Sequence, residues 1–256
     1  MTKIVSERNL TALNSGKKLL VGYLLAGYPN KEQFLKVASD CEAAGLDIFE
    51  IGFPSENPFS DGEVIRKAHY MVDSSVRNDV EYWEAIRKTI SRPIWLMGYK
   101  RDLLDTGFYR TLAKMRIMDA LVIPDISFKD RLKLSDELEG YGVDIVGFVN
   151  PEMKDPELEQ CFSSTALVYQ QLYYGRTGMP VVSDGYAEIL KKARKFEHTK
   201  VFAGFGISTS KRVSQLVSEG FDGAILGTAM INKLNESEHE LIAFVKELAN
   251  STKKAG

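Results

Sequence analysis

Eight short apolar runs recur along the chain at fairly even spacing, and this repetition constrains the fold more than any other feature of the sequence. Each run is continuously apolar or β-branched. That pattern is typical of a parallel strand buried on both faces, whereas a half-exposed antiparallel strand alternates apolar with polar residues. The runs cover residues 19–25, 46–51, 93–97, 120–123, 144–149, 166–170, 201–203 and 223–226.

Amphipathic segments with helical spacing lie between the runs. In residues 34–44, for example, Leu35, Ala38 and Cys41 fall on one stripe. Gly45 follows this segment and Gly220 follows another, and glycine commonly ends a helix because it accepts the left-handed conformation there. The sequence therefore predicts strands and helices in strict alternation.

Eight strand–helix units predict an α/β fold, namely a closed (β/α)8 TIM barrel, which takes about 250 residues. A doubly wound sheet is the alternative, but it rarely uses eight evenly spaced units. Residues 4–14 predict an N-terminal helix that caps the bottom of the barrel, and the long segment after the second run predicts an extra helix. No linker or shift in composition divides the chain, so we expect one barrel domain over residues 1–256.

Charge and cysteine content exclude several functional classes. The net charge is −2, so the sequence gives no reason to expect binding to nucleic acid or to a membrane. No secretory segment or membrane span is evident. Only two cysteines are present, Cys41 and Cys161, far apart and each in a helix-like pattern. We therefore expect free thiols and a cytoplasmic protein.

Two carboxylates stand out in residues 49–62. Glu50 lies near the end of the second apolar run, and Asp61 lies on the polar loop that follows it. An ordinary strand followed by a polar turn would account for the same residues. In a parallel barrel, however, chemistry belongs at the carboxyl ends of the strands. Two acids there, in environments that separate their pKa values, can divide acid and base duties.

Glycine turns follow the last two strands. The letters GFGIS occupy residues 204–208 and GTAM occupy residues 227–230, and a short helix is expected to begin at Thr228. Each turn alone could be a tight connection. Together they predict a phosphate site, because glycine backbone N–H groups and a helix N-terminus both favour an anion. The residues expected there are Gly204, Gly206, Gly227 and Thr228. A dinucleotide motif is excluded, because its third glycine is missing.

Other catalytic groups are not indicated. The histidines His69, His198 and His239 are scattered without metal-ligand spacing, so no metal site is predicted. His198 and His239 are expected on solvated helices, and His69 is expected at the surface. No lysine lies on residues 166–174, where a Schiff-base aldolase of this fold carries one, and Lys100 fits a solvated loop better. Carboxylate chemistry on a phosphorylated small molecule, without a cofactor, is the expectation that remains.

The order and spacing of several motifs resemble the tryptophan synthase alpha subunit family over nearly the whole chain. The motifs are AGYP at 26–29, EIGFP at 50–54, PFSDG at 58–62, IPD at 123–125, RTG at 176–178, GFGIS at 204–208 and GTA at 227–229. The resemblance implies a lyase that cleaves indole-3-glycerol phosphate to indole and glyceraldehyde 3-phosphate in tryptophan biosynthesis, with no metal or cofactor. It also implies a separate beta subunit that takes up the indole.

The resemblance assigns roles by matching position. Glu50 would transfer protons, and Asp61 would hold the indole N–H and stabilise the positive charge on the ring. Gly206, Gly227 and Thr228 would hold the phosphate. The substrate pocket would include Tyr23, Met97, Tyr99 and Val122, with Leu172 at the place of a family tyrosine.

This chain also departs from the family pattern in its lid and in loops that face the beta subunit. The departures are MPV at 179–181, SENP at 55–58, Arg101 and DIS at 125–127. Two alternatives therefore stand beside the lyase. One is a free-standing lyase or isomerase acting on another phosphorylated substrate, and the other is a phosphate-ligand binder without catalysis.

Overall fold

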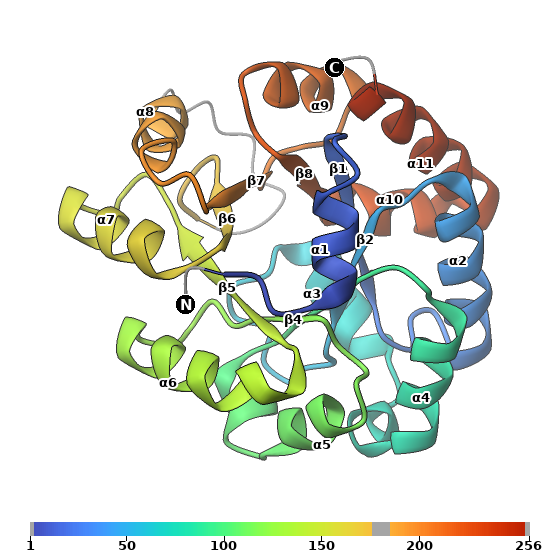
Figure 1. Cartoon of the computed structure of the whole chain (residues 1–256). Coiled ribbons are helices and arrows are strands. Elements are labelled where there is room, and N and C mark those ends of the chain that lie inside the picture. The colour runs from blue at the N-terminus through green and yellow to red at the C-terminus, as the bar shows by residue number, and fades with distance from the viewer. Residues whose placement is uncertain (1–2, 176–184, 254–256) are drawn as a thin grey trace.

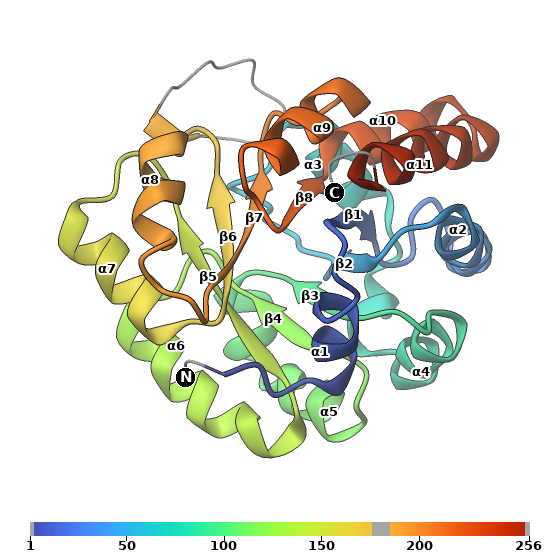
Figure 2. The same cartoon turned by 45° about the horizontal axis from the view of Figure 1, so that its top comes forward.

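The computed structural model describes residues 3–175 and 185–253 and contains the expected eight-stranded closed parallel barrel, with strand order β1 to β8. The strands are β1 (Leu19–Leu25), β2 (Ile48–Gly52), β3 (Ile94–Met97), β4 (Ala120–Val122), β5 (Asp144–Val149), β6 (Leu167–Gln171), β7 (Lys200–Gly204) and β8 (Gly223–Leu226). Figures 1 and 2 show the helices as a ring outside the strands. The predicted runs match the strands to within two residues.

Helices follow the strands as predicted. The α-helices are α1 (Glu7–Leu13), α2 (Lys31–Ala44), α3 (Glu63–Met71), α4 (Val80–Thr89), α5 (Phe108–Lys114), α6 (Phe128–Leu138), α7 (Asp155–Ser164), α8 (Gly185–Ala193), α9 (Ser210–Ser218), α10 (Thr228–Glu236) and α11 (Glu238–Lys253). Short helical turns are η1 (Ser74–Asn78), η2 (Lys100–Leu104) and η3 (Glu139–Tyr141). The long connection after β2 holds α3, η1 and α4, which confirms the extra helix.

Local sequence explains the helix ends. Gly45 ends α2 with φ 107° and Gly220 follows α9 with φ 109°, a left-handed conformation in which glycine avoids the clash of a side chain. Helix α1 is shorter than predicted, because Ser6 is its N-cap and accepts from the backbone N–H of Asn9. The buried stripe of α2 is centred on Val37, Ala38 and Cys41, and Leu35 lies at its margin.

Alternate residues of each strand face either the barrel interior or the helices. Val21, Trp95 and Phe202 belong to the interior cluster, and the rings of Trp95 and Phe202 meet edge to face at 5.0 Å. A larger apolar cluster fills the space between strands and helices. Cys41 and Cys161 are buried free thiols, as expected.

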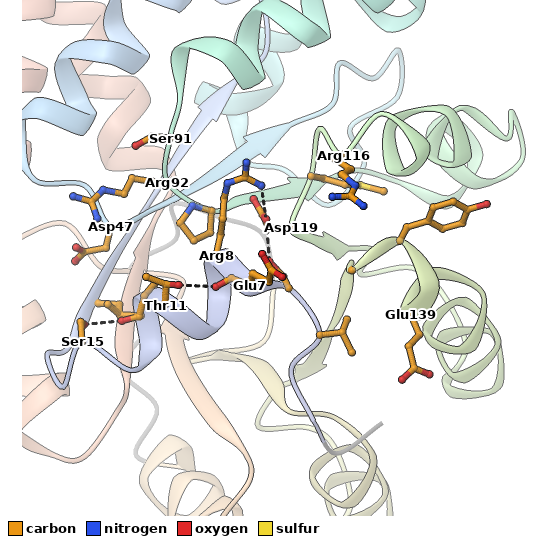
Figure 3. Close-up of a pocket in the computed structure, with 18 of the residues that line it drawn as sticks. Glu7, Arg8, Thr11, Ser15, Asp47, Ser91, Arg92, Arg116, Asp119 and Glu139 are labelled. Carbon is orange, nitrogen blue, oxygen red and sulfur yellow. Dashed lines mark hydrogen bonds and ion pairs between the residues drawn. The ribbon is translucent and has the colours of Figure 1, made fainter.

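Helix α1 lies across one end of the barrel (Figure 1) and is fixed there by polar contacts. Asn9 donates to the side chain of Asp144 at 2.8 Å and accepts from the indole N–H of Trp95 at 3.0 Å. A cavity of about 800 Å³ opens beside this helix, and Figure 3 shows Arg8 and Asp119 on its wall. Its wall carries both signs of charge, and Asp119 already accepts from Arg87 and from Ser6. This end of the barrel therefore has a structural role, as predicted for the capping helix.

Candidate active site

A cavity of about 490 Å³, called here the acid cavity, lies at the carboxyl ends of the strands. Glu50 points into it from β2, and Asp61 reaches it from the loop after β2. The fold thus brings the two predicted acids to one space. The lining residues are Tyr23, Glu50, Phe59, Ser60, Asp61, Ile65, Met97, Tyr99, Pro124, Asp125, Phe148, Asn150, Tyr169, Gln171, Tyr174, Gly175, Phe205 and Gly227.

Glu50 is buried, and one of its carboxyl oxygens makes no hydrogen bond to the described residues. Its side-chain oxygen Oε1 is enclosed and has no hydrogen-bond partner among the described residues. Burial raises the pKa of Glu50 to about 8, and the negative charge of Asp61 adds to the rise. Glu50 therefore holds a proton at neutral pH and can donate it to a ligand in the acid cavity.

Asp61 lies in a different environment. Its Oδ2 accepts a hydrogen bond of 2.6 Å from the phenol of Tyr99. Burial raises the pKa of Asp61 to about 6, and the hydrogen bond from Tyr99 opposes that rise. At neutral pH Asp61 is therefore mostly ionised while Glu50 is protonated. A pair of neighbouring carboxyl groups in opposite protonation states can supply one acid and one fixed negative charge.

Aromatic rings surround the acids. The rings of Phe59 and Tyr99 lie 4.7 Å apart, and those of Phe148 and Tyr169 lie 4.8 Å apart. Phe205 meets the ring of Tyr169 edge to face at 5.9 Å. Flat apolar walls of this kind suit a planar aromatic ligand.

A second cavity of about 440 Å³, called here the glycine cavity, is lined by Gly206, Gly227 and Thr228. Helix α10 begins at Thr228, as predicted, so its positive end faces this space. The hydroxyl oxygen of Thr228 is buried without a partner among the described residues. Lys233 also lines the cavity and pairs with Glu236 at 2.7 Å. These groups form a cradle suited to an anion.

The two cavities adjoin, because Tyr169, Phe205 and Gly227 line both. Phe205 adopts a left-handed backbone with φ 72°, although it is not glycine. Such a conformation carries strain and persists only where the surroundings fix it. Because the two cavities share these wall residues, one ligand with an aromatic part and an anionic part can extend from one cavity into the other.

The five residues predicted to line the substrate pocket differ in where the structure places them. Tyr23, Met97 and Tyr99 line the acid cavity, but Val122 does not and instead belongs to the interior cluster. Leu172 belongs to the larger cluster rather than to the wall of either cavity. Gln171 takes the expected place on β6 and lines the acid cavity, since consecutive strand residues face opposite sides.

Gly204 also differs from the prediction in its placement. It does not line the glycine cavity, and a side chain there would meet the ring of Tyr169 at 2.3 Å. Its structural use is thus the close packing of Tyr169 against β7. The predicted motif RTG at 176–178 and the departure MPV at 179–181 lie outside the described residues.

The predictions for the histidines were partly wrong. His69 is buried with only 6% of its surface exposed, and it contacts the site. His198 lies in a turn rather than on a solvated helix, and its ring contacts the carbonyl of Phe162 at 3.0 Å. His239 is exposed on α11, as expected. The only signal in the sequence for the burial of His69 is its position in the amphipathic helix that follows the Asp61 loop, because one face of such a helix packs inward.

Within residues 3–175 and 185–253, no three His, Cys, Asp or Glu side chains gather in a way that could hold a metal ion. The helices of this described part are too short or too polar to cross a membrane. Lys100 begins the helical turn η2 rather than lying in a loop, and its half-exposed ammonium group pairs with Asp105 at the end of that turn.

Known proteins resemble this chain over nearly its whole length. The family model described as tryptophan synthase alpha chain matches residues 10–255. A tryptophan synthase alpha chain from Methanopyrus kandleri is 30% identical, over 97% of this chain and 94% of its own length. One from Caldicellulosiruptor bescii is 29% identical, over 97% and 98%.

Solved structures show the same fold. A structure of Mycobacterium tuberculosis tryptophan synthase superposes with a TM-score of 0.84 at 24% identity, covering 97% of this chain and 98% of that one. A mutant tryptophan synthase alpha-subunit from Pyrococcus furiosus gives 0.79 at 25% identity, covering 91% and 99%.

Proposed function

The chain belongs to the tryptophan synthase alpha chain family, and we propose that it is a lyase that cleaves indole-3-glycerol phosphate to indole and glyceraldehyde 3-phosphate. One observation carries the proposal. A protonated Glu50 and an ionised Asp61 face one aromatic-walled cavity that opens into a glycine cradle. Indole fits the former and phosphate the latter.

The chemistry follows from the two protonation states. Glu50 donates its proton to carbon 3 of the indole ring, and the ring nitrogen takes up the positive charge. Asp61 accepts the indole N–H and stabilises that charge as a fixed anion. Glu50, now a carboxylate, removes the proton from the glyceryl hydroxyl next to the ring. The carbon–carbon bond then breaks, its electron pair returns to the ring, and the hydroxyl carbon becomes the aldehyde.

Binding of the phosphate aligns the reacting bond. The backbone at Gly206 and Gly227, the hydroxyl of Thr228 and the start of α10 are the proposed phosphate contacts. Holding the phosphate end places the indole against Glu50, which converts binding energy into orientation. The pocket contacts proposed for indole are Tyr23, Met97, Tyr99 and Gln171, which line the acid cavity.

The proposed function is tested with Glu50→Gln. Glutamine keeps the size of the side chain but cannot give up and regain the proton, so indole release is expected to be lost. Binding of a phosphate analogue such as glycerol 3-phosphate is expected to survive. A wild-type chain that releases no indole, with or without a beta subunit, would refute the proposal. A panel of phosphorylated substrates, followed by detection of glyceraldehyde 3-phosphate, would then test the alternative of a different substrate.

A beta subunit of tryptophan synthase is the proposed partner. Phe59 and Tyr174 line the acid cavity and are exposed by 47% and 66%, so the mouth of the site carries apolar surface. A partner that receives indole would cover such a surface. Mixing the chain with a beta subunit in a sedimentation experiment tests the pairing.

The buried free thiols of Cys41 and Cys161 support a reducing, cytoplasmic location.

A further inference from the structure

His69 joins the two ends of the loop that carries Asp61. Its ring lies on α3, directly after that loop. The Nδ1 atom accepts a hydrogen bond of 3.0 Å from the backbone N–H of Ser55 at the start of the loop. The Nε2 atom lies 3.7 Å from Oδ2 of Asp61 near the end of the loop and 3.5 Å from the phenol oxygen of Tyr23.

The bond from Ser55 fixes the tautomer of the ring. A backbone N–H can only donate, so Nδ1 must be the unprotonated nitrogen. In the neutral ring the proton is then on Nε2, which faces the oxygens of Asp61 and Tyr23. Burial lowers the pKa of His69 to about 4, in agreement with a neutral ring.

We propose that His69 is a positioning residue of the lyase site, which holds the Asp61 carboxylate and its loop in place through a fixed Nε2–H tautomer. This inference rests on the proposed function. Tyr99, which follows β3, holds the same Oδ2 atom through its phenol, so Asp61 is approached from the end of β3 and from α3. The distance of 3.7 Å between Nε2 and Oδ2 of Asp61 is longer than a hydrogen bond, and such contacts in an active site commonly shorten when substrate binds.

The charged and titratable groups that face the ring agree with this role. Asp61 faces the ring from the loop, and Tyr23 faces it from β1. Glu50 is close enough to Tyr23 that its negative charge contributes to raising the pKa of the Tyr23 phenol. No cation is paired with Asp61 among the described residues, so the groups that face its charge are the neutral phenol of Tyr99 and the nearby Nε2–H of His69. Removing the Nε2–H donor is therefore expected to favour the protonated form of Asp61.

Nitrogen NMR of the wild-type chain labelled at histidine tests the tautomer directly. The signal absent from the spectrum of His69→Gln identifies His69 among the three histidines. We expect a neutral ring with the proton on Nε2 at all values between pH 5.5 and about 8. A ring that gains a proton within this range, or that carries its proton on Nδ1, would overturn the inference even if the chain proves to be an active lyase.

Two substitutions test the effect on catalysis. His69→Gln retains an acceptor for Ser55 and a donor toward Asp61, and we expect nearly wild-type turnover. His69→Leu removes both, and we expect kcat to fall about 10- to 100-fold with little change in KM. The acidic limb of the pH profile should also move to higher pH. His239→Gln on exposed α11 is the control.

The outcomes separate the two proposals. A folded His69→Leu variant with unchanged kcat and an unchanged acidic limb would refute the positioning role. If that variant does not fold, the tautomer measured in the wild-type chain decides the question. A wild-type chain without lyase activity would instead refute the proposed function, whatever the tautomer of His69.

Discussion

The phenol of Tyr99 donates a 2.6 Å hydrogen bond to Oδ2 of Asp61. Tyr99 follows β3, and Asp61 belongs to the loop after β2, so the bond joins the ends of neighbouring strands above the acid cavity. Because it favours the ionised form, it holds the pKa of Asp61 below the value that burial alone would give.

Tyr99→Phe removes this bond while keeping the ring. The pKa of Asp61 should rise, so the acidic limb of kcat/KM should move up by about one pH unit, and kcat/KM at pH 7 should fall about twofold. Steady-state rates of indole release from pH 5 to 9 measure both. Tyr109→Phe is the matched control, since its phenol donates to Glu137 on the barrel exterior. An acidic limb that does not move in Tyr99→Phe would contradict the assignment.

The wild-type pH profile of kcat/KM should be bell-shaped. Below about pH 6 Asp61 gains a proton and no longer stabilises the ring charge, and above about pH 8 Glu50 loses the proton that it must donate. The two limbs are properties of the coupled pair, because each charge affects the other. Rates that continue to rise through pH 9 would exclude a protonated Glu50 as the acid.

Gly206→Ala should weaken phosphate binding. Gly206 has φ 73°, and a side chain there would lie 2.8 Å from the ring of Tyr173. We expect KM to rise about 10-fold or more, because the glycine turn must shift. Gly16→Ala is the matched control, with φ 74° and open space around it, and it isolates the cost of the backbone conformation. Calorimetric titration with glycerol 3-phosphate measures the loss, and equal affinity in Gly206→Ala would remove the turn from the phosphate site.

Asn9→Ala should destabilise the chain without altering the chemistry. It removes the partner of the Trp95 indole N–H and a donor to Asp144, both buried. We expect the free energy of unfolding to fall by about 3 kcal/mol. Urea denaturation measures this, with the exposed Thr11→Ala on the same helix as control. If kcat of Asn9→Ala is reduced at urea concentrations where the variant is still folded, the capping helix affects the active site.

The fold and most of the site could be predicted from the sequence, but contacts at the ends of the strands could not. Leu172 was expected in the pocket, yet Gln171 lines it, because a shift of one residue moves a strand side chain to the opposite face. His69 was expected at the surface, although its helical position permits either side. Its burial follows from the way α3 packs behind the loop of Asp61.

The sequence alone determined the eight-stranded barrel and the strand ends that carry Glu50, Asp61 and the glycine turns. Burial on both faces and helical amphipathicity leave a local pattern in the chain, and barrel closure then fixes where the strand ends meet. Only the tertiary structure decided the protonation states of the two acids and the partners of Asp61. Those depend on burial and on contacts among Tyr99, His69 and Tyr23, which come from separate segments and leave no periodic signal.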